Sequence, residues 1–335
     1  MVTLAELTGF ADGPPLVASD GILERVRSLG KMLQANALNL LTERAEIWSY
    51  TRNGRVSCGG ATRLMPTADG WMALSLTRPD DEDLVPAWLG CEPDWPAIES
   101  AVSSGIAADL VERGRLLGLP VAALGERTPG NLAEWHLIDE AAPIARAPVV
   151  VDLSSLWAGP LCSRLLRERG ARVMKVESKT RPDGSRNGPA AFFELMHAGK
   201  EFRSIDFTAD ALRDVLRSAD VVIEGSRPRA LEQLGIDARE ILQQGPRVWL
   251  SITGHGRQEP QRNWVGFGDD AAVAGGLVAW SEGQPTFMGD AIADPLTGLA
   301  AAAAILAALK DGGRWLIDCN LAGVAAHVAG DAGSQ

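Results

Sequence analysis

The chain has 335 residues, of which 46% are hydrophobic and 22% are charged, values typical of a globular protein with room for two domains. Its net charge of −11 disfavours nucleic acid as the main partner, because phosphate backbones bind to basic surfaces. The four cysteines lie far apart and form no CxxC pair, so neither a metal site nor a disulfide framework is predicted.

Two further features bear on location. Residues 1–10 lack the basic start of a signal peptide, and the longest apolar stretch, residues 299–309, is short for a bilayer span. We therefore expect a cytoplasmic protein in a reducing compartment, without a membrane partner.

The first part of the chain predicts a small α+β domain. Leucines and valines at near-helical spacing predict helices over residues 19–48, and residues 70–76 read as a strand after a turn. A helical pattern broken by three prolines follows over 81–117, and then a short strand at 119–123. Residues 125–148, rich in proline and glycine, predict a linker, so we place the first domain at residues 1–146.

From residue 149 onward, apolar runs alternate with amphipathic segments. Strands are expected at 149–153, 173–177, 203–207, 220–224, 247–252 and 315–318, with helices between them and further helices at 295–309 and 320–329. This alternation is typical of βαβ units in a parallel sheet. We predict a Rossmann-like domain over residues 147–335.

The turn after the first of these strands carries Gly159 and Pro160 instead of a GxGxxG motif, which disfavours NAD and FAD. The loop at 225–229 follows a parallel strand and carries two arginines, Arg227 and Arg229. They are suited to hold phosphates by charge-assisted hydrogen bonds, or to solubilise an exposed loop; the residues alone favour neither.

Asp294 precedes Pro295 and an alanine-rich run, which is a good helix N-cap pattern. By itself this favours a structural role, but a carboxylate at the positive end of a helix also stays ionised and acts as a nucleophile. Asp290 is its competitor. Gly59 and Gly60 are suited to a mobile hinge or to a simple turn.

Three segments resemble the family III CoA-transferases in order and spacing over residues 149–329: DLSSLWAGPLCSRLLRERGARVMKVE, DVVIEGSRPRALEQLG and ADPLTGLAAAAAILAAL. Within residues 1–145, the segments ERAEIWSYTRNGRV, PTADGWMALSL and DLVERGRLLGLPVAAL resemble the second half of the same family. The chain therefore looks circularly permuted, with the small domain before the Rossmann-like domain; one slice of a tandem fusion is the alternative. The resemblance implies that the helix at 19–45 and the segment 320–329 are neighbours in space.

The resemblance also implies a chemistry. In the family, an aspartate at the position of Asp294 attacks an acyl-CoA thioester and carries the acyl group and then CoA. Gly59 and Gly60 fall where the family has a glycine loop over its active site. The implied substrates are an acyl-CoA and a carboxylic acid, with coenzyme A thioester as substrate and no permanently bound cofactor, and the implied assembly is a homodimer.

Contacts to CoA are implied for a set of residues near the carboxyl ends of the strands: Trp157, Ala158, Ser178, Lys200, Gly225, Ser226, Arg227 and Arg229. This set departs from the family, because Ser178 and Gln233 stand where relatives have arginines and Glu201 replaces another.

Two alternatives to CoA transfer stay open. An acyl-CoA racemase or isomerase on the same fold needs a second acid–base group, for which His255 and Asp269 are the candidates. A non-catalytic CoA-transferase-like subunit is the third hypothesis, suggested by the missing basic residues and the permuted order.

Overall fold

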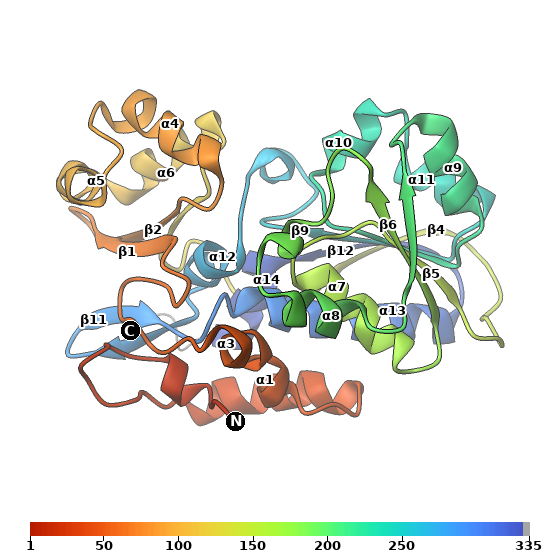
Figure 1. Cartoon of the computed structure of the whole chain (residues 1–335), viewed down its shortest axis with the longest axis horizontal. Coiled ribbons are helices and arrows are strands. Elements are labelled where there is room, and N and C mark those ends of the chain that lie inside the picture. Colours follow the sequence, from red (N-terminus) through yellow and green to blue (C-terminus); the bar gives the residue numbers. More distant parts are fainter. Residues whose placement is uncertain (331–335) are drawn as a thin grey trace.

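A computed structural model describes residues 1–330. Its centre is a seven-stranded sheet in the order β4-β12-β9-β8-β5-β6-β7 (Figure 1). Six strands pair in parallel and β4 runs antiparallel to β12 at one edge. The strands are β4 (Glu134–Asp139), β5 (Val149–Asp152), β6 (Arg172–Ser178), β7 (Glu201–Ile205), β8 (Val221–Glu224), β9 (Val248–Thr253) and β12 (Arg314–Asn320).

Helices cover both faces of this sheet, which explains why its inner strands are continuous apolar runs. Val150 and Val221 point into one core and their neighbours Val151 and Val222 into the other, as the two-residue period of a strand requires. The first face carries α7 (Ala158–Arg167), α8 (Ala190–His197), α13 (Ala293–Asp311) and α14 (Leu321–Ala329). The second face carries α9 (Ala209–Arg217), α10 (Pro228–Gln233) and α11 (Ala238–Gln244).

A second, smaller layer precedes the large sheet in the chain. An antiparallel sheet of β1 (Thr62–Pro66), β2 (Trp71–Ser75) and β3 (Val121–Ala123) is covered on one side by helices. These are α4 (Pro79–Leu89), α5 (Trp95–Val102) and α6 (Ala107–Leu117), which lie at the upper left of Figure 1.

Helix α12 (Gly268–Ala274) joins the two sheets. Its Val273 packs with Leu64 and Ala73 of the small sheet and with the hairpin β10 (Val278–Ser281)–β11 (Gln284–Phe287). Ala271 and Ala272 on the same helix belong to the core of the large sheet. The start of α12 therefore lies where both layers meet.

The N-terminal helices pack beneath α13 (Figure 1), which fulfils the expectation that the segments 19–45 and 320–329 are neighbours. Arg25 of α1 donates to the carbonyl oxygens of Val328 (2.7 Å) and Ala329 (2.9 Å), which end α14. These helices are α1 (Asp20–Met32), α2 (Ala37–Leu40) and α3 (Glu43–Trp48).

Helix α13 is the longest helix in the described chain. It has 19 residues and is long and apolar enough to cross a membrane by composition, but 72% of its apolar window is buried inside the fold. A core helix of a globular domain has the same properties.

Most elements lie where the sequence predicts them, with differences at the edges. The predicted linker 125–148 contains β4. Its Trp135 and Leu137 are about half exposed and separated by His136, so no long apolar run reveals the strand. The strand expected at 203–207 is β7 at 201–205, an exposed edge strand. The strands β1, β10 and β11 lie outside the predictions. The boundary at 146/147 stays a prediction, although β4 joins the sheet of the second part.

Candidate active site

Asp294 is the second residue of α13, and this corrects the prediction that it is the N-cap. The helix begins at Ala293 after the cap residue Ile292, and no side chain caps it. The half-buried carboxylate of Asp294 is thus free of a capping bond and lies at the positive end of the helix. The backbone N–H of Gly268 donates to it, and a Cβ atom at position 268 would collide with Asp294 Oδ2. Glycine is therefore required beside this carboxylate.

A buried ion pair lies next to Asp294. Arg44 of α3 binds Asp290 with two nitrogens, Nε at 2.7 Å from Oδ2 and Nη2 against Oδ1. Asp290 is fully buried, and the guanidinium also lies 4.8 Å from the ring centroid of Trp157. Burial is the largest single effect and lowers the pKa of Arg44. The charge and hydrogen bonds of Asp290, together with the charges of Asp269 and Asp294, outweigh it, so the net pKa is raised. Arg44 therefore stays charged.

The third carboxylate belongs to Asp269, the second residue of α12, and it lies against the loop that carries Asp290. Its Oδ1 accepts from the N–H of Ala291 at 2.9 Å, and its Oδ2 accepts from the hydroxyl of Thr62 at 3.4 Å. Burial, and then the charge of Asp290, raise the pKa of Asp269 to about 6.

The pKa of Asp294 is also raised, to about 7. Burial is the largest cause, the charge of Arg44 opposes it, and the charges of Asp269 and Asp290 add to it. A carboxylate with such a pKa is a stronger nucleophile than a free one and is still ionised in a substantial fraction at neutral pH.

Asp270, adjacent to Asp269, is a different case because it is fully buried without a cation. Its Oδ1 accepts from the hydroxyl of Ser75 (2.7 Å) and from the N–H of Phe267 (3.0 Å), and its Oδ2 has no partner within the described chain. Burial raises the pKa of Asp270 to about 7. A neutral carboxylic acid fits this environment better than an anion.

The predicted glycine loop lies beside this cluster. Cys58 Sγ approaches the carbonyl oxygen of Gly289 at 3.4 Å, and a Cβ at Gly59 would lie 3.6 Å from the hydroxyl of Tyr50. Gly60 has φ +81 and open space around it, a conformation that favours glycine. Burial raises the pKa of the Cys58 thiol, so this cysteine stays protonated and is not a nucleophile.

The second part of the site is the crevice at the carboxyl ends of the parallel strands. The order in which successive strands are added to the sheet reverses between β5 and β8, which is where open α/β sheets bind ligands. The loops after these strands touch there, since a Cβ at Gly225 would lie 3.0 Å from Ser154 Cβ. Trp157 and Ala158 are buried in the turn after β5, whereas Gly225 is exposed.

Four arginines gather around this crevice, two of which sequence analysis misses. Arg227 is half-buried, and burial together with the charges of Arg229, Arg78 and Arg181 lowers its pKa. Arg181 follows β6, and Arg78 precedes α4 of the small layer, where it pairs with Asp81. Within residues 1–330, no ion pair involves Arg181, Arg227 or Arg229. Uncompensated arginines at a sheet switch point form an anion-binding site.

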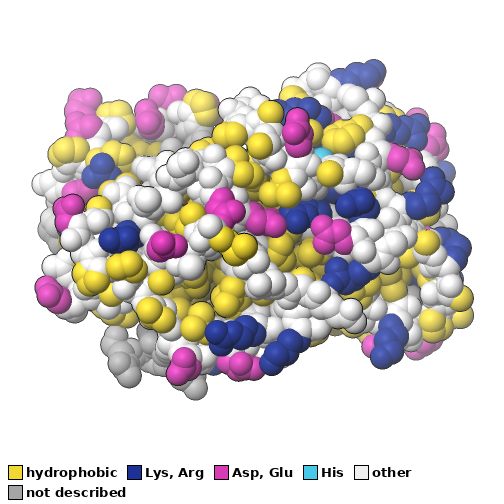
Figure 2. Space-filling model, turned by 60° about the horizontal axis from the view of Figure 1, so that its bottom comes forward, with side chains coloured by type: hydrophobic (Ala, Val, Ile, Leu, Met, Phe, Trp, Pro, Cys, Tyr) yellow, Lys and Arg dark blue, Asp and Glu magenta, His cyan; other side chains and the backbone are white. Residues whose placement is uncertain are grey.

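On the face drawn in Figure 2, the basic side chains are also unevenly distributed. Lysine and arginine side chains gather mainly in its right half, over the large sheet, although the chain as a whole is acidic. The remaining crevice candidates have local partners: Ser178 Oγ lies 3.1 Å from the hydroxyl of Thr180, and Ser226 Oγ lies 3.5 Å from Glu224 Oε1.

The structure contradicts the prediction for Lys200. Its ammonium group is buried and donates to Ser163 Oγ (2.7 Å) and the carbonyl oxygen of Pro160 (3.0 Å), beside Asp152 Oδ2 at 3.3 Å. Burial lowers its pKa to about 8. Lys200 holds the helix α7 to the strand β5 from inside, and its charge does not reach the crevice.

His255 also lies apart from the carboxylates. It is buried edge-on against Trp264, with centroids 5.5 Å apart, and Trp264 stacks on Arg115 of α6. Burial, and then the charges of Arg115 and Arg127, lower its pKa to about 3. Of the two acid–base candidates for an isomerase, only Asp269 lies in the cluster of Asp294.

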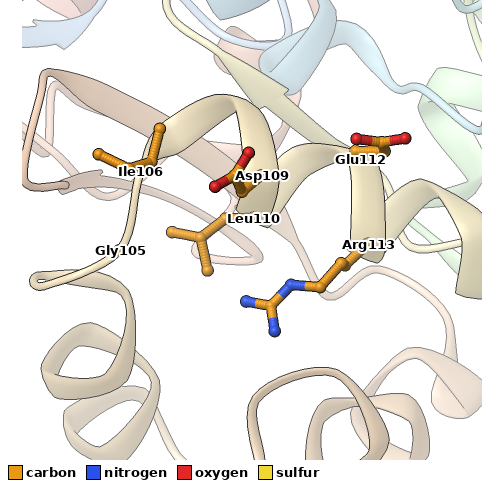
Figure 3. Close-up of a pocket in the computed structure, with 6 residues that line it drawn as sticks. All are labelled: Gly105, Ile106, Asp109, Leu110, Glu112 and Arg113. Carbon is orange, nitrogen blue, oxygen red and sulfur yellow. The ribbon is translucent and has the colours of Figure 1, made fainter.

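A surface hollow of about 470 Å³ has no part in this site. It lies on α6 and is lined by Gly105, Ile106, Asp109, Leu110, Glu112 and Arg113 (Figure 3). Its charged side chains are those of an exposed helix start.

These features define an open-sheet α/β protein with a carboxylate of raised pKa at a helix start and unpaired arginines near the strand ends of its large sheet. Residues 148–333 match the model of CoA-transferase family III, and the chain belongs to this family.

Similar proteins cover part of the chain. An acyl-CoA transferase of Fusarium pseudograminearum is 30% identical over 227 residues, 60% of this chain and 50% of the relative. A succinate–glutarate CoA-transferase of Agrobacterium fabrum is 31% identical over 183 residues, 48% and 45% of the two chains. The chain thus spans about half the length of the curated relatives that it matches.

Solved structures give the same result. A CAIB/BAIF family protein from Brucella suis aligns with a TM-score of 0.51 and 29% identity over 56% of each chain. A hypothetical protein from Mycobacterium tuberculosis aligns with a TM-score of 0.51 and 25% identity over 56% of this chain and 58% of its own.

The Arg44–Asp290 pair makes a first prediction. In Arg44→Gln, Asp290 is left as an unpaired buried charge, so we expect a loss of about 3 kcal/mol in the free energy of unfolding. In the double variant with Asp290→Asn, part of this loss should return, because the unpaired charge is gone. Urea unfolding of the two single variants and the double variant measures it; strictly additive losses would contradict the pairing.

Asp270 makes a second prediction. A carboxyl with a pKa raised to about 7 in the folded state binds a proton that the unfolded chain has lost above about pH 4, so stability falls as the pH rises between these values. Asp270→Asn should remove this slope, up to ~1.4 kcal/mol per pH unit, and stay folded. Denaturant unfolding from pH 4.5 to pH 8 tests it; an unchanged slope in the variant would refute a neutral Asp270.

Proposed function

We propose that this chain transfers CoA between an acyl-CoA and a carboxylic acid, with Asp294 as the covalent carrier. The observation that carries the proposal is the position of Asp294: a half-buried carboxylate with a raised pKa at a helix start, with a backbone N–H on one side and a buried guanidinium nearby. The membership of this chain in CoA-transferase family III supports the same chemistry.

The proposed reaction is a double displacement. A carboxylate oxygen of Asp294 attacks the thioester carbonyl carbon, the C–S bond breaks, and the electron pair leaves with sulfur as CoA thiolate. The thiolate then attacks the aspartyl carbonyl of the mixed anhydride and releases the donor as a carboxylate. An acceptor carboxylate reverses these two steps and leaves with CoA. No proton is consumed, so the site needs hydrogen-bond donors and exclusion of water rather than a strong base.

The arginine cluster supports CoA as the ligand. CoA carries three phosphate groups, and Arg181, Arg227 and Arg229 offer unpaired guanidinium groups at the strand ends. The predicted contacts of Trp157, Ala158, Ser178, Gly225 and Ser226 remain part of the proposal, with Gly59 and Gly60 as the lid over Asp294. Arg181, which has no ion-pair partner within the described residues, would supply part of the charge that the family carries at Ser178 and Gln233, whereas Arg78 is held by Asp81.

We further propose a domain order, an assembly, a location and an acyl donor for this chain. The match of residues 148–333 to the family, with the small layer before it, supports a permuted order of the family's halves. We propose a homodimer and a cytoplasmic location. We also propose that the donor is drawn from small dicarboxylic acyl-CoA thioesters, because a similar protein is named succinate–glutarate CoA-transferase.

A second candidate function rests on one observation. Asp269 and Asp294 are two carboxyl groups with raised pKa in one cluster, as proton exchange at the α-carbon of an acyl-CoA requires. Uptake of deuterium from solvent by an α-methyl acyl-CoA, with no acceptor acid present, would favour an isomerase.

The covalent role of Asp294 makes a third prediction. Asp294→Asn should lose CoA exchange between succinyl-CoA and a panel of dicarboxylic acids by at least 10³-fold, because an amide is not a nucleophile. Binding of CoA by calorimetry should stay within a few-fold. Asp311→Asn, at the exposed other end of α13, is the matched control and should exchange CoA normally. Activity of the Asp294→Asn variant would exclude the proposed carrier.

The crevice makes a fourth prediction. Arg229→Gln should weaken CoA binding about tenfold, because a charge-assisted hydrogen bond to phosphate is lost. The effect should shrink at high ionic strength. Arg239→Gln on α11, an exposed arginine of the same half, is the control and should bind CoA as the unaltered protein does. Equal effects of both substitutions would indicate a general field instead of a phosphate site.

A further inference from the structure

The carboxylate cluster around Asp294 is not charge-balanced. Asp269, Asp290 and Asp294 share one guanidinium, that of Arg44, which is committed to Asp290 through two of its nitrogens. The other titratable groups around the cluster are Tyr50 and Cys58, both with a raised pKa, and Asp270, which is buried without a cation. When Asp269 and Asp294 are both ionised, the three carboxylates and the one guanidinium therefore leave the cluster with a net charge of −2.

Two hydrogen bonds hold the carboxylate of Asp269 in place. The N–H of Ala291 holds Oδ1, and the hydroxyl of Thr62, itself 2.8 Å from Ser75 Oγ, holds Oδ2. Both donors are neutral, so they orient the carboxylate without cancelling its charge.

Asp269 and Asp294 are held by the same short stretch of backbone. Ala291 donates its N–H to Asp269, and its carbonyl oxygen accepts the N–H of Asp294 at 2.9 Å. Gly268, which directly precedes Asp269, donates its N–H to the carboxylate of Asp294. The two side chains are thus held as neighbours by backbone groups of the loop before α13 and of the start of α12.

We propose that ionised Asp269 drives acylation of Asp294 by charge repulsion, and that Thr62 is the positioning residue that keeps it in place. This inference rests on the proposed function. Asp269 acts through Asp294 and needs no contact with the substrate. Its effect is to make the ionised form of Asp294 unfavourable, so that any reaction that removes this charge is favoured.

The balance of the reaction shows where the charge goes. Asp294 as a carboxylate and an acyl-CoA become an aspartyl-CoA thioester and a free donor carboxylate. The acyl carbon forms a C–O bond to a carboxylate oxygen of Asp294 as its C–S bond breaks. A new C–S bond then forms at Cγ of Asp294 as the Cγ–O bond breaks, so this oxygen leaves on the donor carboxylate, and nothing is oxidised or reduced. The negative charge leaves the cluster on the released carboxylate, and the repulsion from Asp269 leaves with it.

Two measurable quantities should therefore change together: the pKa of Asp294 and the equilibrium constant for aspartyl-CoA formation. Protonation and acylation both remove the charge of Asp294, so Asp269 should favour both by a similar factor. In Asp269→Asn, the acid limb of the pH profile should move to lower pH, because the pKa of Asp294 falls. For each unit of this move, the equilibrium constant for aspartyl-CoA formation at pH 8 should fall about tenfold.

The experiment uses intact-mass spectrometry of the full chain with succinyl-CoA and succinate at fixed ratios. The fraction of protein that carries CoA gives the equilibrium constant, and single-turnover rates from pH 5 to pH 8.5 give the acid limb. Asp109→Asn, an exposed acid in the first turn of α6, is the matched control and should change neither (Figure 3). Asp269→Ser is a second variant, and Thr62→Val should reproduce the shift in part while Thr62→Ser should not.

The outcomes separate the inference from the proposed function. The inference is supported if, in both Asp269 variants, the acid limb of the pH profile moves to lower pH and the fraction of protein that carries CoA falls. An unshifted limb, or an unchanged adduct fraction, overturns it while CoA transfer through Asp294 stands. If the unaltered protein forms no adduct with any thioester while it binds CoA, the proposed function fails, and the inference falls with it.

Discussion

The buried pair of Arg44 and Asp290 is the interaction on which the site depends. Arg44 comes from the N-terminal helices, Asp290 from the loop before α13, and the ring of Trp157 from the crevice of the large sheet. One guanidinium therefore joins three segments that are far apart in the chain. Since a buried charge is tolerated only with a partner, these segments are held in one arrangement, and Asp294 is placed by it.

In the proposed function, ligand binding and reaction use different parts of the structure. Unpaired arginines lie at the strand ends of the large sheet, whereas unpaired carboxylates lie where the two layers meet. An acidic protein can thus hold an anionic ligand in one place and oppose negative charge in another. A thioester spanning both regions would be attracted at its phosphates and attacked at its carbonyl.

Local patterns predict the helices and inner strands because their residues report burial directly. The segment from β5 to β6 and the helix α13 are clear in the sequence for this reason. Edge strands such as β4 are half exposed and leave no such pattern. Among site residues, Asp294 is predicted through its resemblance to a family, not through its helix-start pattern, which indicates a cap that the structure lacks.

The remaining site residues depend on contacts between distant segments. Arg44 and Asp290 are 246 positions apart, and Ser75 and Asp270 are 195 apart, so no local pattern connects them. Arg181 and Arg78 join the crevice only after the loops are folded. The resemblance to the family assigns Lys200 to the ligand, but its partners Asp152 and Ser163 lie inside the domain.

The central claim is that Asp294 carries the substrate covalently. The most direct test is to incubate the protein with succinyl-CoA, quench with hydroxylamine, and map the modified peptide by mass spectrometry. Our account predicts a hydroxamate on Asp294, and none on Asp269 or Asp290. A hydroxamate on another carboxylate, or no adduct in a protein that binds CoA, would contradict it.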